Sequence, residues 1–357
     1  MAIGLEKKEM EGITIKEIAK LCGVGVSTVS RAINNHPDIN EETKQKIMDT
    51  IKQYNYIPNN SARNLKRSAS KTIGIFMKGM TNPFFTKMIR IFQEEIDQNH
   101  YDMILQEISE EEDELEIALE IIKEKKLKGI VFLGGYFNHT QEQLKLIPVP
   151  FVLTTITLKD DIDPSIYSSV SVDDYLESYK MTKYLIHGLG HQKIAILGAT
   201  KKDTSIGNLR LAGYRDACLE DNIDNESLVC YSEESDDVYS LKNGYEMTKR
   251  LLSSNKEFTC LYAISDVMAI GASKALLEAG KRIPEDCAVA GFDGLEETFY
   301  YNPSITTVKQ PSKKMAQEAI RILFALIYKK EKNQHIVFEG ELLERESTRK
   351  QKEENGM

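Results

Sequence analysis

The stretch TIKEIAKLCGVGVSTVSRAIN, residues 14–34, decides the fold of the first part of this 357-residue chain. Thr14 and Glu17 have the spacing of a capping box, in which two side chains satisfy free N–H groups at a helix start. Apolar residues then recur at i, i+3, i+4 and i+7, which predicts one face of an amphipathic helix: Ile15, Ile18, Ala19 and Cys22. Gly23 and Gly25 end this helix after about two turns.

A second helix is predicted over 26–34. The residues expected to face inward are Val29, Ala32 and Ile33. Those on the opposite face are Val26, Ser27, Ser30 and Arg31. That composition is typical of a helix that contacts base edges and phosphates of DNA. A third helix begins after its N-cap, Asn40, and we expect it to pack through Ile47, Ile51 and Tyr54. Three short helices in this order predict a helix-turn-helix.

Charge is divided unevenly along the chain. Residues 1–71 hold 12 basic and 8 acidic residues, a net charge of +4, whereas the remainder holds 34 basic and 47 acidic residues, a net charge of −13. A basic front end on an acidic body is typical of a protein whose first part binds a polyphosphate. Segment 59–71 carries four basic residues and no acidic one: Arg63, Lys66, Arg67 and Lys71.

Cysteine usage and hydropathy indicate the compartment. The five cysteines are scattered without any CxxC pair, which is typical of buried thiols in a reducing environment. Residues 1–12 alternate in charge and lack the apolar core of a secretory signal. No apolar run approaches the ~20 residues that a membrane helix needs. We therefore expect a soluble cytoplasmic protein with no membrane partner.

From Lys71 onward, short apolar strands alternate with helical patterns. Strands are predicted over 72–77, 102–107, 129–133, 150–155, 169–172, 193–197, 227–231, 259–263 and 287–292. Helices are predicted over 83–99, 111–126, 174–187, 208–221, 240–253, 266–279 and 312–328. This alternation predicts parallel sheets with helices on both faces. The strands fall into two groups that divide near 169–173.

Seven pieces of the sequence, in this order, resemble the lactose/galactose repressor family of bacterial regulators: VSTVSRAIN (26–34), YIPNNSARNL (56–65), IGIFM…NPFF (73–85), LRLAGY (209–214), SDVMAIGA (265–272), VAGFDG (289–294) and PSITTVKQP (303–311). The similarity extends from Ile13 to about Thr348. It implies an all-α helix-turn-helix headpiece followed by a two-lobed α/β body like that of periplasmic sugar-binding proteins.

The resemblance also implies the domain boundaries. The headpiece covers 13–58, a hinge helix and linker 59–71, the effector-binding and dimerisation body 72–348, and a disordered tail 349–357. Within the body, the first lobe takes about 72–170 and 311–340, and the second about 171–310 and 341–348. The tail has no leucine heptads, so we expect a homodimer rather than a tetramer.

In the headpiece, the resemblance places Val26, Ser27 and Arg31 against base edges, and Thr28 and Ser30 near phosphates or the rim of the bases. Arg31 is the best single candidate for a bidentate contact with guanine. The family commonly has serine where this chain has a glycine at position 25. Glycine is a tolerable N-cap but offers no hydroxyl group to a phosphate.

In the hinge, the resemblance makes Leu65 a wedge in the minor groove that kinks the duplex. Ala62 is small enough for two hinge helices to approach each other, and Lys66 is the third hinge residue expected to contact DNA. The alternative for Leu65 is packing against the headpiece or the body.

The resemblance assigns effector contacts to the body. Arg210 and Asp293 match positions that hydrogen-bond the effector, although Asp293 alone is also typical of a turn. Of two adjacent aromatics, one is expected in the core and the other as a stacking surface. The complete predicted set is Phe84, Phe85, Arg210, Tyr239, Ser265, Asp266 and Asp293. A guanidinium and a carboxylate near an aromatic face suit a polyhydroxylated ligand, such as a sugar or sugar phosphate.

We therefore expect a transcriptional regulator, a repressor, that binds a palindromic double-stranded DNA operator as a homodimer and responds to a carbohydrate effector. The alternatives are a sugar-binding transport protein and a cytoplasmic enzyme on the same fold. The headpiece disfavours transport, and the sequence has no GxxxxGK[ST], GxGxxG after a strand, or GxSxG motif. His187 and His191 are separated by two glycines and would not share a helix face, so we expect no metal or cofactor.

Overall fold

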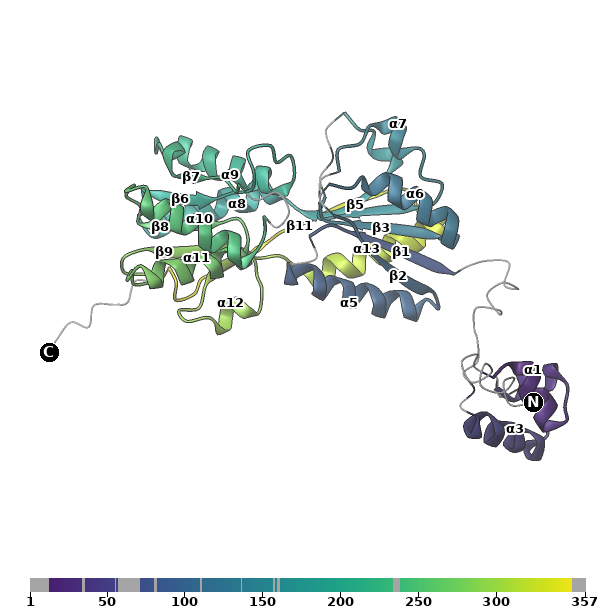
Figure 1. Cartoon of the computed structure of the whole chain (residues 1–357). Helices are drawn as coiled ribbons and strands as arrows, with labels where there is room; N and C mark the ends of the chain where they lie inside the picture. The colour runs from purple at the N-terminus through teal and green to yellow at the C-terminus, as the bar shows by residue number, and fades with distance from the viewer. Residues whose placement is uncertain are drawn as a thin grey trace. The chain divides into compact units, whose positions relative to one another are not determined.

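The computed structural model describes residues 13–348, except 34–35, 55, 57–70, 80–81, 110, 136, 157, 159–160 and 234–237. The chain divides into two compact units, Met1–Ala69 and Ser70–Met357 (Figure 1). Three predicted DNA-binding residues lie outside the described residues: Ala62, Leu65 and Lys66. The predicted tail, 349–357, also lies outside them.

The headpiece packs three helices around a small apolar core. They are α1 (Ile15–Cys22), α2 (Val26–Ile33) and α3 (Glu41–Gln53). The predicted capping box is present, because the Glu17 carboxylate accepts a hydrogen bond from the Thr14 N–H at 2.9 Å and the Glu17 N–H donates to the Thr14 hydroxyl at 3.4 Å. The buried core comprises Ile18, Ala19, Cys22, Val29, Ala32 and Ile47.

Tyr54 lies outside this core, contrary to the sequence prediction. Helical spacing from Ile47 and Ile51 would bring Tyr54 inward only if the helix continued. However, α3 ends at Gln53, and Tyr54 is 45 % exposed. The chain then turns back with the Tyr56 N–H donating to the Ile51 carbonyl at 3.0 Å, and Tyr56 packs on the core instead.

The first lobe of the body is built on a six-stranded parallel sheet with the order β11-β5-β4-β3-β1-β2. Its strands are β1 (Thr72–Met77), β2 (Asp102–Glu107), β3 (Gly129–Leu133), β4 (Phe151–Thr154), β5 (Ser168–Val172) and β11 (His335–Phe338). Its helices are α5 (Pro83–Gln98), α6 (Glu114–Lys125), α7 (Gln141–Leu144) and α13 (Ser312–Ile327).

The second lobe has a six-stranded sheet with the order β12-β10-β9-β8-β6-β7, parallel except for β12. Its strands are β6 (Ile194–Leu197), β7 (Val229–Cys230), β8 (Cys260–Ala263), β9 (Ala288–Asp293), β10 (Thr306–Lys309) and β12 (Glu341–Leu343). Its helices are α8 (Asp174–Lys183), α9 (Ile206–Glu220), α10 (Leu241–Ser253), α11 (Asp266–Glu278) and α12 (Glu297–Tyr300). A π-helical turn, Tyr184–Gly188, extends α8.

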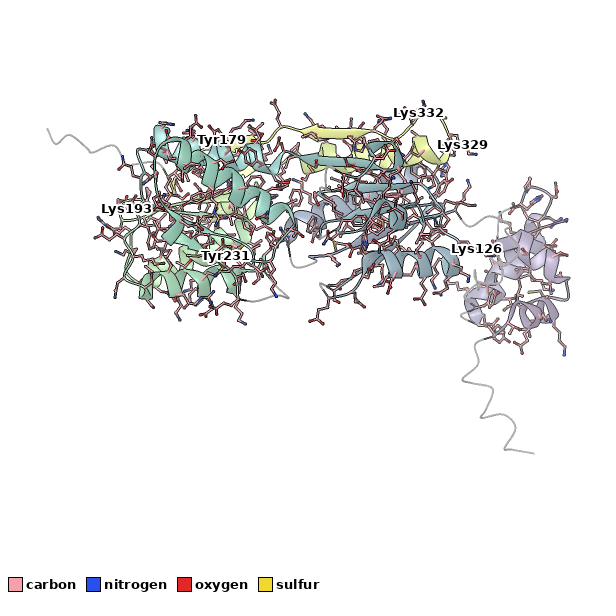
Figure 2. The ribbon with its side chains drawn as sticks, turned by 90° about the horizontal axis from the view of Figure 1, so that it is seen from above. Lys126, Tyr179, Lys193, Tyr231, Lys329 and Lys332 are labelled. Atoms are coloured by element: carbon pink, nitrogen blue, oxygen red, sulfur yellow. The ribbon has the colours of Figure 1, made fainter. Side chains whose placement is uncertain are left out.

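Central strands of both sheets are buried along their whole length, as β3, β6 and β8 show. Near-continuous apolar runs are typical of parallel strands that helices cover on both faces. Figure 2 separates the lobes from above, with Lys126, Lys329 and Lys332 labelled on the first and Tyr179, Lys193 and Tyr231 on the second. The predicted fold class, a helical headpiece with a two-lobed α/β body, is confirmed. Among the described residues, no helix has both the length and the apolarity to cross a membrane.

The chain passes between the lobes three times, after β5, between β10 and α13, and between β11 and β12. Figure 1 shows the result, because α13, in yellow, lies beside α5 of the first lobe. Ligands of open α/β sheets bind at the carboxyl ends of the strands. Polar side chains from both lobes meet at such ends here: Asn82 after β1, Asp293 at the end of β9 and Gln310 after β10.

Candidate functional site

One face of α2 carries the polar side chains that the sequence predicts for DNA contact. Val26, Ser27 and Arg31 are exposed, with Val26 exposed by 42 %, whereas Thr28 and Ser30 are half-buried. The opposite face of α2 holds Val29 and Ala32 against α1 and α3. The structure therefore presents Arg31 and its neighbours to a partner, while their assignment to particular bases or phosphates stays a prediction.

Arg210 of α9 is buried in the second lobe and is 1 % exposed. Its Nε donates to Asp174 Oδ1 at 2.8 Å, and one terminal nitrogen donates to the Ile264 carbonyl at 2.5 Å. The same nitrogen lies 3.5 Å from Asp293 Oδ1. The guanidinium also stacks on Phe292, with its carbon 3.7 Å from the ring centroid. Arg210 therefore positions Asp293, because its own donors are held within the protein.

A glycine explains how Arg210 reaches Asp174. Asp174 is the first residue of α8, and Gly213 lies one turn after Arg210 on α9. A Cβ atom at position 213 would lie 2.2 Å from the Tyr175 carbonyl oxygen, so only glycine permits this close approach of α8 and α9. The LRLAGY motif thus supplies both the cation and the contact that pairs it.

Asp293 connects the two lobes. Its Oδ2 accepts a hydrogen bond from Asn82 Nδ2 of the first lobe at 3.2 Å, and its Oδ1 accepts one from Gln310 Nε2 at 2.8 Å. Asp293 is 3 % exposed and has a positive φ of 121°, a strained conformation for a residue with a Cβ atom. We call Asn82, Asp174, Arg210, Asp293 and Gln310 the interlobe network.

Burial controls the electrostatics of this network. It raises the pKa of Asp293 to about 6, although Arg210, Asn82 and Gln310 each favour the carboxylate. Burial likewise raises the pKa of Asp174 against the attraction of Arg210. The pKa of Asp266 is raised well above its usual range, first by burial and then by the charge of Asp293. Three buried carboxyl groups near one guanidinium make the network sensitive to protonation.

Ser265 and Asp266 serve the start of α11. The Ser265 hydroxyl accepts a hydrogen bond from the Met268 N–H at 3.3 Å as the N-cap, and Asp266 Oδ2 accepts one from the Leu295 N–H at 2.7 Å. Both residues are 0 % exposed. They fix the loop that follows β9 and thereby the position of Asp293. A direct contact of either residue with an effector stays a prediction.

The predicted aromatic residues differ in their surroundings. Phe84 and Phe85 are both buried, in an edge-to-face pair 5.5 Å apart, within the apolar cluster of the first lobe. Neither ring is left as an open stacking surface in this structure, so that assignment stays a prediction. Tyr239 is half-buried and packs on the core of the second lobe, with its hydroxyl directed toward Gly207.

Sequence reasoning missed three members of the interlobe network: Asn82, Asp174 and Gln310. Asn82 precedes Pro83 and caps α5, so it was interpretable as a helix start alone. Gln310 lies in the quoted piece PSITTVKQP, where a polar residue after a buried strand is a signal for a site. Nothing in the spacing pairs Asp174 with Arg210, which lies 36 residues further along the chain.

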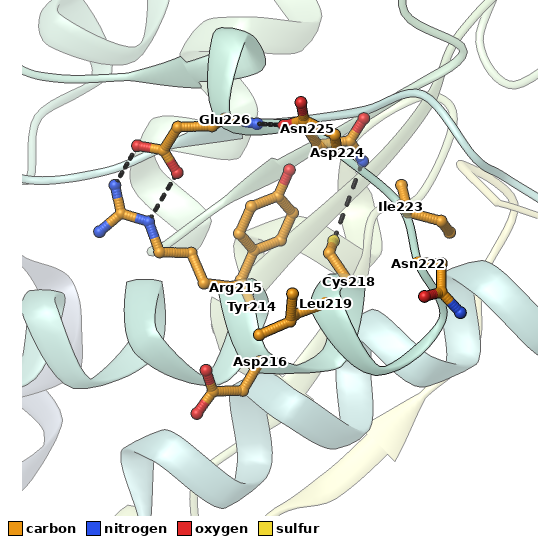
Figure 3. A pocket seen from close by; sticks show the side chains of 10 residues that line it. All are labelled: Tyr214, Arg215, Asp216, Cys218, Leu219, Asn222, Ile223, Asp224, Asn225 and Glu226. Carbon is orange, nitrogen blue, oxygen red and sulfur yellow. Dashed lines mark hydrogen bonds and ion pairs between the residues drawn. The ribbon is translucent and has the colours of Figure 1, made fainter.

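A larger pocket of about 550 Å³ lies elsewhere, along the second half of α9 and the loop after it (Figure 3). Its lining includes Tyr214, Cys218 and Leu219, and Leu219 is 74 % exposed. No predicted effector residue lines it. We therefore place the candidate site at the interlobe network. Within the described part of the chain, no group of His, Cys, Asp or Glu side chains is arranged to hold a metal ion.

The raised pKa of Asp293 predicts pH-dependent ligand binding. A carboxyl group with a pKa of about 6 takes up its proton as the pH falls below 6, where an ordinary aspartate stays ionised. If ligand hydroxyl groups donate to the carboxylate, calorimetry should show affinity about tenfold lower at pH 5 than at pH 7. Asp293→Asn should flatten this profile. A dependence that survives in Asp293→Asn would assign it to Asp174 or Asp266 instead.

A helix-turn-helix headpiece on a two-lobed α/β body with a buried polar site defines the class of DNA-binding transcriptional regulators. A model of the bacterial regulatory proteins of the lacI family matches residues 14–59, and one of a periplasmic binding protein-like domain matches residues 184–348. The chain is 43 % identical over 337 residues to the HTH-type transcriptional regulator MalR of Clostridium butyricum, covering 94 % of this chain and 99 % of that protein. The chain belongs to the lacI family.

Solved structures agree with this assignment. The complex of the transcriptional regulator CelR with cellobiose is similar with a TM-score of 0.69 and 26 % identity, covering 94 % of this chain and 99 % of that one. The Lac repressor dimer bound to its operator is similar in fold with a TM-score of 0.70 and 22 % identity, covering 95 % of this chain and 99 % of that one.

Proposed function

We propose that this regulator is a repressor that binds a palindromic operator as a homodimer and is controlled by a carbohydrate bound at the interlobe network. A palindromic site presents two equivalent half-sites, so two headpieces must be paired by their bodies. The cellobiose bound to CelR supports a sugar as the effector class. Because chromosomal DNA is its partner, the protein works in the cytoplasm, by binding and without a catalytic step.

One observation carries the effector part of this proposal. The Asp293 carboxylate is buried, belongs to the second lobe, and accepts a hydrogen bond from Asn82 of the first lobe. A carboxylate offers about four acceptor positions, and charge-assisted hydrogen bonds to hydroxyl groups are strong in a site without water. A sugar held by Asp293 would therefore contact the residue through which the two lobes communicate.

The Asn82 contact gives a route from ligand to DNA. At 3.2 Å it is longer than the Gln310 contact at 2.8 Å, and a sugar hydroxyl can replace it on the same oxygen. Such replacement favours a different arrangement of the lobes. The operator affinity then changes only by the ligand's differential affinity for the two arrangements.

Binding to the DNA upstream of its own gene tests the proposal. We expect footprinting of the full-length protein to reveal a palindromic site, and light scattering to show a dimer both free and bound. Addition of the effector sugar should change the operator affinity. Protection of a single unpaired half-site by a stable monomer would contradict the proposed assembly.

A further inference from the structure

A small polar pocket of about 70 Å³ lies where β6 leads into α9. Asp203, Gly207 and Asn208 line it at the start of the helix, and Tyr231 lines it from the strand after β7. These residues lie outside the interlobe network. The pocket is therefore a second place in the same lobe where a polar ligand group can be held.

Asp203 has one carboxylate oxygen in use and one to spare. Its Oδ1 accepts a hydrogen bond from the Ser205 N–H at 2.8 Å, just before α9 begins. Its Oδ2 is buried, and the described residues give it no hydrogen-bond partner. The residue as a whole is 7 % exposed. A helix-start role explains Oδ1, but a buried carboxylate oxygen without a donor is costly unless a ligand supplies one.

Gly207 keeps the space beside that oxygen open. It is the second residue of α9, where alanine would form a better helix. A Cβ atom at this position would lie 2.5 Å from Asp203 Oδ2 and 2.6 Å from the Tyr239 hydroxyl oxygen. The two oxygens therefore face the same small volume, which any side chain larger than hydrogen would fill.

The cations around this pocket have other partners. Arg215 Nε donates to Glu226 at 2.9 Å, the pair drawn in Figure 3, and Arg215 also donates to the Tyr231 hydroxyl at 2.7 Å. The Lys201 ammonium lies 5.4 Å from the centre of the Tyr231 ring. Asp203 thus gives the buried part of the pocket a negative charge, which favours neutral hydroxyl donors and repels phosphate or carboxylate groups.

The position of the pocket relative to Asp293 sets the size of the ligand. In the sheet, β8 separates β6 from β9, so the loop after β6 lies two strand spacings, roughly 10 Å, from Asp293 at the end of β9. One sugar ring does not span that distance. Gly207 lies one helical turn before Arg210, so the pocket and the interlobe network share one face of α9.

Resting on the proposed function, we propose that Asp203, Gly207 and Tyr239 form a subsite for the second ring of a neutral oligosaccharide whose first ring binds at Asp293. A hydroxyl group of that second ring donates to Asp203 Oδ2. The effector is then an uncharged sugar of at least two rings, and not a sugar phosphate bound at this end.

Calorimetry of the full-length protein with glucose, glucose 6-phosphate, maltose, cellobiose and lactose tests the subsite. We expect one of the disaccharides to bind at least about tenfold more tightly than glucose, and glucose 6-phosphate to gain nothing over glucose. Asp203→Asn and Gly207→Ala should each remove the disaccharide advantage and leave glucose binding unchanged. The matched control is Asp224→Asn, because Asp224 accepts the same kind of hydrogen bond from Glu226 N–H but lies outside this pocket.

The outcomes separate the two proposals. Equal binding of glucose and every disaccharide, or full disaccharide affinity in both variants, would overturn the subsite and leave control by a sugar at Asp293 intact. Tighter binding of glucose 6-phosphate than of every disaccharide would also overturn it. Failure of all five sugars to bind would overturn the carbohydrate effector itself. Circular dichroism of both variants checks that a loss of binding reflects the pocket and not the fold.

Discussion

Replacing Arg210 by alanine is expected to lower the free energy of unfolding of the body by about 3–5 kcal/mol. The guanidinium is 1 % exposed and supplies donors to Asp174 and to the Ile264 carbonyl. Its removal leaves a buried carboxylate and a buried carbonyl without their donor, which costs more than the loss of the contacts themselves. Denaturant unfolding followed by fluorescence or circular dichroism measures the change.

Arg215→Ala is the matched control on the same helix. Arg215 pairs with Glu226 near the surface, and its side chain is 37 % exposed. Exposed ion pairs contribute less than about 1 kcal/mol, so this variant should unfold close to the wild type. Equal stability of the two variants would contradict the positioning role of Arg210. A loss of effector response in Arg210→Ala is then interpretable only alongside its stability.

Replacing Arg31 by alanine is expected to lower specific operator affinity by about 1–3 kcal/mol for each base pair contacted, once in each half-site. Arg31 is exposed on α2, on the face opposite the buried Val29 and Ala32. Loss of a bidentate contact with guanine should also relax the sequence preference at that position. Fluorescence anisotropy with operator variants substituted at each base pair measures both effects.

Lys52→Ala separates base reading from simple charge. Lys52 lies exposed in the last turn of α3, so its removal takes away one positive charge without touching α2. It should weaken binding to all sequences about equally and leave the preference unchanged. If Arg31→Ala gave this same uniform loss, Arg31 would be a phosphate contact and not a reader of bases.

Much of the architecture could be predicted from sequence because the signals are local. Alternating apolar strands and amphipathic helices located β1 and β2 to the residue, and most other elements to within a few residues. Three strands were missed: β10, β11 and β12 are short, and β11 and β12 lie at sheet edges, where burial is incomplete. Tyr54 was misplaced because periodicity cannot show where a helix stops.

The candidate site was harder to predict because its contacts are not local. Arg210 and Asp293 were found through motif resemblance, but their chemistry depends on partners far away in the chain. Asp174 holds Arg210 within the second lobe, and Asn82 reaches Asp293 across 211 positions of sequence. Sequence therefore suggested a guanidinium that grips the ligand, whereas the structure shows one that supports a carboxylate. Asp203 gave no motif at all, and only its burial and missing donor distinguish it.

Operator affinity with and without sugar, in the wild type and in Asp293→Asn, tests the central claim most directly. The effector is the sugar of the calorimetric panel that binds most tightly. Asparagine keeps the size of the side chain and an oxygen that can accept from Asn82 or Gln310, so DNA binding without sugar should stay near the wild-type value. The sugar should change the wild-type operator affinity and leave that of Asp293→Asn unaltered. An equal response to the sugar in both proteins would place effector control away from the interlobe network.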